Sequence, residues 1–126
     1  MSCARSIVLA LGLVALTAIG PALRPAIGAE PTQVKVETSA GDSVLQLDEV
    51  RAPLTVANFL KYVNDGFYDG TIFHRVVNGF VIQGGGYTPD MTLKPPRPGL
   101  VNESGNGLTN KRGSVAMART AEPHSG

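Results

Sequence analysis

Polar and hydrophobic residues alternate over the segment that begins near residue 34. Val34 and Val36 have polar neighbours, and so do Val44 or Leu45 and Leu47 further along. The sequence Ser-Ala-Gly-Asp at 39–42 lies between the two alternating runs and has the composition of a tight turn. This pattern predicts a β-hairpin.

The spacing of the hydrophobic residues changes in the next segment. They now recur at i, i+3, i+4 and i+7, which places them on one face of a helix: Val56, Phe59, Leu60 and Val63. Pro53 suits the first turn of this helix, and Gly66 suits its C-terminal end. We therefore expect an amphipathic helix that covers a core.

A second hairpin is predicted within Phe-His-Arg-Val-Val-Asn-Gly-Phe-Val-Ile-Gln-Gly-Gly-Gly, residues 73–86. A two-residue Asn78-Gly79 turn would place Arg75 opposite Ile82. A three-residue connection, 78–80, would instead pair Val77 with Val81 and place Arg75 opposite Gln83, because one residue of slip moves a strand's side chains to the other face.

We expect the three-residue connection, since only this register brings the two polar side chains together. One face of the hairpin would then carry Phe73, Arg75, Val77, Val81 and Gln83. The other would carry Ile72, His74, Val76 and Ile82, and we expect this almost apolar face to be the inner one, with a groove on the first face.

The remainder of the chain has weaker signals. Residues 85–113 contain four prolines, many glycines and no sustained period, and we expect a long irregular loop. Residues 113–119 are a further strand candidate with Val115 and Met117 on one side. Five strands and one helix indicate a mainly β protein, a barrel or a sandwich. Since fewer than 100 residues follow residue 29, we expect residues 30–126 to be the N-terminal part of a longer domain.

The first 29 residues have the three-part pattern of a secretory signal peptide. Arg5 precedes an apolar run at 7–19, and small residues follow up to a cleavage point after Gly28 or Ala29. The alternative is a single membrane anchor, but the run is short for a span, which needs about 20 residues. We expect an exported protein, most simply periplasmic, with no stable membrane association after cleavage.

Cleavage would remove Cys3, the only cysteine, so the exported chain would contain no disulfide. It would leave nine Lys and Arg against ten Asp and Glu, and a net charge of −1 gives no indication of nucleic-acid binding.

The two histidines, His74 and His124, have no carboxylate cluster beside them, so we expect no metal site and no cofactor. The three glycines at 84–86 lack the Gly-Lys-Ser/Thr of a phosphate loop and indicate tight backbone packing.

The stretch at 73–88 resembles the signature of the cyclophilin family of peptidyl-prolyl isomerases: Phe73, His74, Arg75, Gly79, Phe80, Gln83, Gly84 and Gly85 match. Residues 52–75 resemble the family's first helix and the lead into its third strand, and residues 106–119 resemble its later Gly-x-x-x-Met-Ala strand. The predicted signal peptide and the Met-Ala-Arg-Thr motif at 117–120 resemble those of the family's exported bacterial members.

The resemblance implies an eight-stranded antiparallel barrel capped by two helices, of which this chain would supply about the first five strands and the first helix. It implies an enzyme that isomerises X-Pro bonds in unfolded or extended polypeptides. We expect this enzyme to be a monomer. Arg75 matches the catalytic arginine, Phe80 and Val81 the wall of the proline pocket, Gln83 the amide that binds substrate backbone, and Ala118 and Arg119 the strand edge along which the peptide lies. We read His74 as structural.

Three features depart from the family pattern. Many members have Met at the position of Val81 and Asn at the position of Arg119. The family's Ser-Gln-Phe-Phe strand, with the later residues that complete the proline pocket, is not within this sequence. Two other functions therefore stay open: a peptide-binding chaperone module without catalysis, and an inactive truncated fragment.

Overall fold

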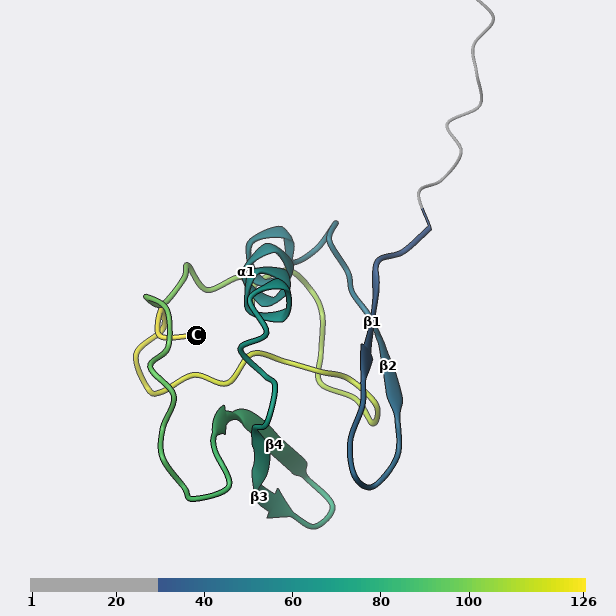
Figure 1. Ribbon diagram of the computed structural model, residues 1–126. Helices are drawn as coiled ribbons and strands as arrows, with labels where there is room; N and C mark the ends of the chain where they lie inside the picture. Colours follow the sequence, from purple (N-terminus) through teal and green to yellow (C-terminus); the bar gives the residue numbers. More distant parts are fainter. Residues whose placement is uncertain (1–29) are drawn as a thin grey trace, which may run out of the picture.

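The computed structural model describes residues 30–126, so the predicted signal peptide at 1–29 lies outside the described part. In chain order, one β-hairpin precedes a single helix and a second follows it, and a long irregular segment comes last (Figure 1). The order is β1 (Gln33–Val36), β2 (Ser43–Gln46), α1 (Pro53–Asn64), β3 (Ile72–Val77) and β4 (Val81–Tyr87). The prediction of a mainly β chain with one early helix is confirmed. No helix within residues 30–126 is long and apolar enough to cross a membrane.

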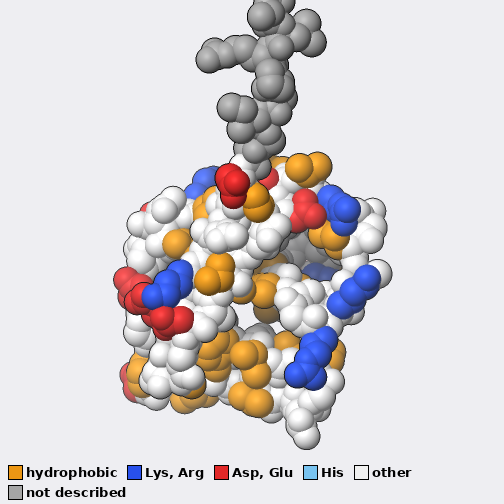
Figure 2. Space-filling model, turned by 90° about the vertical axis from the view of Figure 1, so that its right-hand side faces the viewer, with side chains coloured by type: hydrophobic (Ala, Val, Ile, Leu, Met, Phe, Trp, Pro, Cys, Tyr) orange, Lys and Arg blue, Asp and Glu red, His pale blue; other side chains and the backbone are white. Residues whose placement is uncertain are grey.

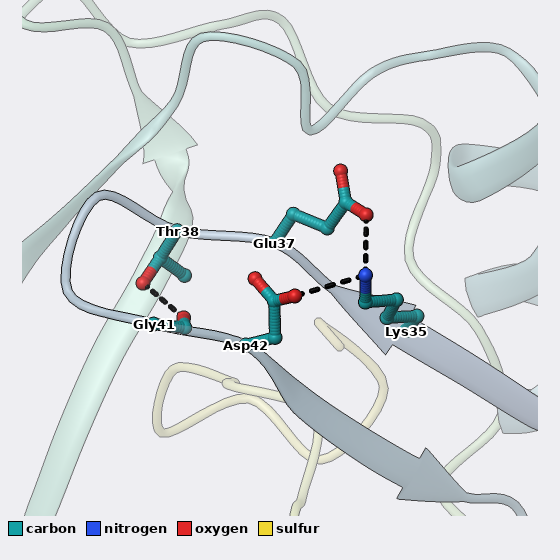
Figure 3. A network of polar contacts seen from close by, with 5 residues as sticks. All are labelled: Lys35, Glu37, Thr38, Gly41 and Asp42. Carbon is teal, nitrogen blue, oxygen red and sulfur yellow. Dashed lines mark hydrogen bonds and ion pairs between the residues drawn. The ribbon is translucent and has the colours of Figure 1, made fainter.

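The first hairpin forms where alternation predicts it. Val34 pairs with Leu45 and Val36 with Ser43 in an antiparallel register. Gly41 has φ +120° in the connecting turn, and the hydroxyl of Thr38 donates a 2.6 Å hydrogen bond to its carbonyl oxygen (Figure 3). The Lys35 ammonium lies 2.7 Å from the Glu37 carboxylate and 2.9 Å from that of Asp42.

These contacts raise the pKa of Lys35, through the hydrogen bond to Glu37 first and that to Asp42 second. All three side chains are exposed to solvent, where ion pairs contribute little to stability. The pairing therefore orients the turn rather than stabilising the fold.

The helix α1 covers the predicted range and ends as its sequence predicts. Gly66 has φ +64°, and its N–H donates to the carbonyl oxygen of Val63 while the N–H of Phe67 donates to that of Tyr62. This pair of bonds is the Schellman motif, which requires a residue with positive φ after the helix.

The core of the described region is small and centred on α1. Val56 and Tyr62 are its buried hydrophobic residues, at 6% and 8% exposure. Tyr62 packs against Phe67, with ring centroids 4.6 Å apart, and Phe59 packs against Tyr68 at 5.5 Å. Sequence periodicity placed Val56 correctly but did not reveal this aromatic cluster, because half of it follows the helix.

Basic side chains fasten the irregular segment to the aromatic cluster. The backbone N–H of Arg97 donates a 2.6 Å hydrogen bond to the Tyr62 hydroxyl, and its guanidinium pairs with the Asp65 carboxylate. Lys94 lies 4.7 Å from the ring centroid of Phe67 and donates to the Phe67 carbonyl oxygen. The loop after β4 is thus irregular in conformation but tied to α1 by specific bonds.

Two sequence-based expectations are wrong. Residues 113–119 form no strand, because no neighbouring strand within 30–126 accepts their hydrogen bonds, and Val115 is 68% exposed. The described region therefore has four strands rather than five, in two separate two-stranded sheets. The apolar face of the second hairpin is not inner, since Val76 and Ile82 are 69% and 61% exposed. Figure 2 shows hydrophobic side chains open to solvent on one face of the molecule.

Candidate active site

The β3–β4 hairpin adopts the three-residue connection. Val77 pairs with Val81, and Arg75 lies directly opposite Gln83. The Nη1 of Arg75 donates a 3.1 Å hydrogen bond to Oε1 of Gln83. The register prediction is therefore confirmed, and the two polar side chains of the hairpin form one unit.

Phe80, in the connection, presents an apolar surface beside this unit. Its side chain is 77% exposed, and the Arg75 guanidinium carbon lies 6.0 Å from the centre of its ring, at the outer limit of a cation–π contact. Val81 follows Phe80 and is half-buried, and Phe73 adds a ring that is 50% exposed on the strand that carries Arg75. A fixed cation thus lies beside exposed apolar surface.

The glycines after Gln83 let the hairpin bend. The pairing shifts register between Ile72 and Arg75, so that Phe73 pairs with Gly84. Gly85 has φ +90°, and a Cβ there would lie 2.9 Å from ring carbons of Tyr68. Tight backbone packing, the interpretation made from the sequence, is confirmed at this position.

His74 lies on the strand face opposite to Arg75. Its ring packs on Tyr87, with centroids 4.5 Å apart, and its Nδ1 is buried without a hydrogen-bond partner among the described residues. The contact with Tyr87 agrees with a packing role for this histidine.

Ala118 and Arg119 lie in the irregular segment at 113–126 and not on a strand. Within residues 30–126 no hydrogen bond or ion pair joins them to the β3–β4 hairpin; Nη1 of Arg119 donates instead to the carbonyl oxygen of Thr120. The structure therefore brings together Arg75, Phe80, Val81 and Gln83 and leaves Ala118 and Arg119 on a separate segment.

A hollow of about 370 Å³ lies between that segment and the N-terminus of α1. Its lining includes Met117 and Arg119 from that segment, together with Thr55 and Glu103. Burial alone would raise the pKa of Glu103, but hydrogen bonds from Thr55 and Leu54 outweigh it and lower the pKa. The carboxylate is therefore held in its charged form.

Sequence patterns do not single out Glu103 as a functional residue. It lies in a glycine-rich and asparagine-rich loop without periodicity, and its partners on α1 are 48 and 49 residues away. Among residues 30–126 no group of three or more His, Cys, Asp or Glu side chains could hold a metal ion.

Residues 33–126 match the family described as cyclophilin type peptidyl-prolyl cis-trans isomerase/CLD. The chain belongs to this family. Its relatives include peptidyl-prolyl cis-trans isomerase A of Dickeya dadantii, 50% identical over 113 residues, or 90% of this chain and 58% of the relative. Isomerase cyp18 of Streptomyces antibioticus is 58% identical over 92 residues, 73% of this chain and 55% of the relative.

Peptidyl-prolyl cis-trans isomerase B of Escherichia coli is 53% identical over 92 residues, 73% of this chain and 56% of that protein. This cyclophilin-family chain thus spans little more than half the length of these curated relatives. The resemblance seen in separate motifs extends through residues 33–126.

Proposed function

We propose that this cyclophilin-family protein accelerates cis/trans isomerisation of X-Pro peptide bonds in unfolded or extended polypeptides. The observation that carries the proposal is the Arg75 guanidinium, held by Gln83 at 3.1 Å and lying 6.0 Å from the exposed ring of Phe80. The names of the three relatives, all peptidyl-prolyl isomerases, support the same reaction.

The chemistry of the reaction needs little more than these groups. The barrier to rotation, about 18–20 kcal/mol, is the loss of amide resonance, and no covalent bond to the substrate has to form. As the amide twists, its nitrogen regains a lone pair and becomes a hydrogen-bond acceptor. A guanidinium N–H directed at this nitrogen stabilises the twisted state more than either planar state, which lowers the barrier.

The remaining residues would hold the peptide. In this proposal Phe80 and Val81 form one wall of the apolar pocket for the proline ring. Because Oε1 of Gln83 accepts the bond from Arg75, its amide Nε2 is left to donate to a substrate carbonyl. Ala118 and Arg119 would supply backbone along which the peptide extends.

The test is a refolding assay on a substrate protein whose slow phase is limited by proline isomerisation. The purified protein should accelerate that phase. Arg75→Ala should reduce the acceleration by about two to three orders of magnitude, the usual effect of removing one transition-state donor. Since Arg75 is exposed, the thermal melt of the Arg75→Ala variant should match that of the native protein. Equal acceleration by both proteins would remove Arg75 from the mechanism.

A second candidate is peptide binding without catalysis. The exposure of Phe73 and Phe80, at 50% and 77%, favours it, because exposed aromatic rings can bind extended apolar segments. Titration of a proline-containing peptide alongside the refolding assay separates the two functions. Binding without acceleration would identify a peptide-binding module, whereas neither activity would identify an inactive fragment.

We also propose export to the periplasm, on the basis of the apolar run at 7–19 and the small residues that follow it. Expression with and without residues 1–29, followed by cell fractionation and mass spectrometry, tests this. Export should require the segment, and the mature protein should begin near residue 29 or 30. A protein that keeps residues 1–29 in the membrane fraction would instead be anchored.

A further inference from the structure

The helix α1 lacks a local cap at its N-terminus. The N-cap position is Ala52, whose methyl side chain cannot accept hydrogen bonds from the free N–H groups of the first turn. Those groups are ordinarily satisfied by a Ser, Thr, Asp or Asn at the N-cap. A residue from elsewhere in the chain takes this role here.

Glu103 supplies the missing cap. Its Oε1 accepts a 3.0 Å hydrogen bond from the N–H of Leu54, and its Oε2 accepts bonds of 2.7 Å from both the N–H and the hydroxyl of Thr55. Leu54 and Thr55 are the second and third residues of the helix, whose N–H groups a local cap would bind. The amide of Asn106, three residues later, donates a further 3.0 Å bond to the carbonyl oxygen of Arg51.

The loop that carries Glu103 holds, in turn, the end of the described chain. The N–H of Asn102 donates a 3.0 Å hydrogen bond to Nδ1 of His124, and the N–H of Leu100 donates a 3.0 Å bond to the backbone oxygen of Gly126. Gly126 packs beside Met117 and Ala118, since a Cβ on it would lie 3.3 Å from Cγ of Met117.

Residues 120–125 close the connection. The N–H and the hydroxyl of Thr120 lie 2.9 and 2.8 Å from Oγ of Ser125. Arg119 donates to the carbonyl oxygen of Thr120. A continuous series of contacts therefore runs from the first turn of α1, through Glu103 and His124, to Ala118 and Arg119, a segment with no strand pairing to hold it.

We propose that Glu103 is a positioning residue for the substrate, because it fixes the segment that carries Ala118 and Arg119 to the first turn of α1. This inference rests on the proposed function, in which the peptide lies along that segment. In this proposal the two parts of the site have different roles. The hairpin with Arg75 lowers the barrier to rotation of the X-Pro bond, and the segment held by Glu103 sets the affinity for the substrate peptide.

The experiment compares the native protein with Glu103→Ala and Glu103→Gln. The control is Glu122→Gln. It also removes one negative charge from the chain after β4, but only backbone atoms of Glu122 make hydrogen bonds within residues 30–126. Amide hydrogen exchange is measured over 54–55 and 116–120. The KM and kcat for isomerisation of a proline-containing tetrapeptide are measured in parallel.

In both Glu103 variants we expect faster exchange over the two regions. We expect KM to rise about fivefold, the factor that corresponds to the loss of one helix cap, with kcat within about twofold of the native value. The control should match the native protein. Unchanged exchange over 116–120, or a fall in kcat at constant KM, would overturn the proposal.

Two further measurements keep the test decisive. Thr55→Val removes one of the three bonds and preserves the helix, so it replaces Glu103→Ala if that variant does not fold; it should give a smaller change in the same direction. If the native protein shows no isomerisation, the proposed function fails by itself. Titration of the tetrapeptide then decides, since weaker binding by Glu103→Gln supports the positioning role and equal binding refutes it.

Discussion

Arg75 and Gln83 face each other across the β3–β4 hairpin and share a 3.1 Å hydrogen bond between Nη1 and Oε1. The geometry of the bond depends on the planar guanidinium, which can bind Gln83 with one N–H group and direct others toward a substrate. A lysine carries its three N–H donors on one nitrogen, so it lacks the planar, spread donors that let one guanidinium bind Gln83 and a substrate in fixed directions.

Arg75→Lys should therefore retain charge but lose most of the proposed activity, by about two orders of magnitude. The measurement is kcat/KM for a proline-containing peptide. Arg112→Lys, at an exposed arginine of the irregular segment, is the control and should have no effect. Full activity in Arg75→Lys would show that charge alone is sufficient.

Gly85→Ala should destabilise the fold by roughly 1–3 kcal/mol, because its φ of +90° is costly for alanine and the new Cβ would meet the Tyr68 ring at 2.9 Å. Urea denaturation measures the loss. Gly86→Ala provides a matched control, since a Cβ at that position would lie 3.9 Å from Leu93, an ordinary contact. Similar effects of the two substitutions would contradict the packing role assigned to Gly85.

Tyr62→Phe should cost about 1–2 kcal/mol, because the buried hydroxyl accepts the Arg97 N–H at 2.6 Å and its removal leaves that donor without its partner. The same substitution at Tyr68, whose hydroxyl makes no hydrogen bond within residues 30–126, should be close to neutral. The difference in the free energy of unfolding between the two variants isolates the bond.

Stability should fall when the pH is lowered through the acidic range. The pKa of Glu103 lies below its ordinary value of 4.5 because hydrogen bonds from Thr55 and Leu54 outweigh the effect of burial. The pKa of Asp90 lies below its ordinary 3.8 because Thr88 and Thr92 donate to it. A carboxyl group with a lowered pKa stabilises the folded state fully above its unfolded pKa and loses this contribution as the pH falls through its folded pKa.

The acid-induced loss from Glu103 should therefore begin below about pH 4.5 and should be reduced in Glu103→Gln. Thermal melts at closely spaced values between about pH 3 and 7 provide the measurement, because they locate the pH midpoint of the loss of stability. An identical pH profile in the variant would show that Glu103 does not contribute to the acid response.

Much of the hairpin and helix structure could be predicted because its determinants are local. The spacing of Val56 and Phe59 fixes the helix face, and the requirement that Arg75 and Gln83 share a face selects the hairpin register. The bond between Glu103 and Thr55 could not be predicted, since it joins residues 48 apart without any periodic pattern. The strand expected at 113–119 is absent, because alternation shows only that a segment can pair, and neither two-stranded sheet of the described region pairs with this one.

The separation of Arg75 from Gln83 by only eight residues has a kinetic consequence. A hairpin of this kind closes in about 1–10 μs, whereas longer loops carry a greater entropic cost of closure. The cation and its amide partner should therefore meet early during folding, and the contact between Glu103 and α1, made across 48 residues, should form later. The hairpin with Arg75, which lowers the barrier, would then form before the segment that binds the substrate peptide is fixed in place.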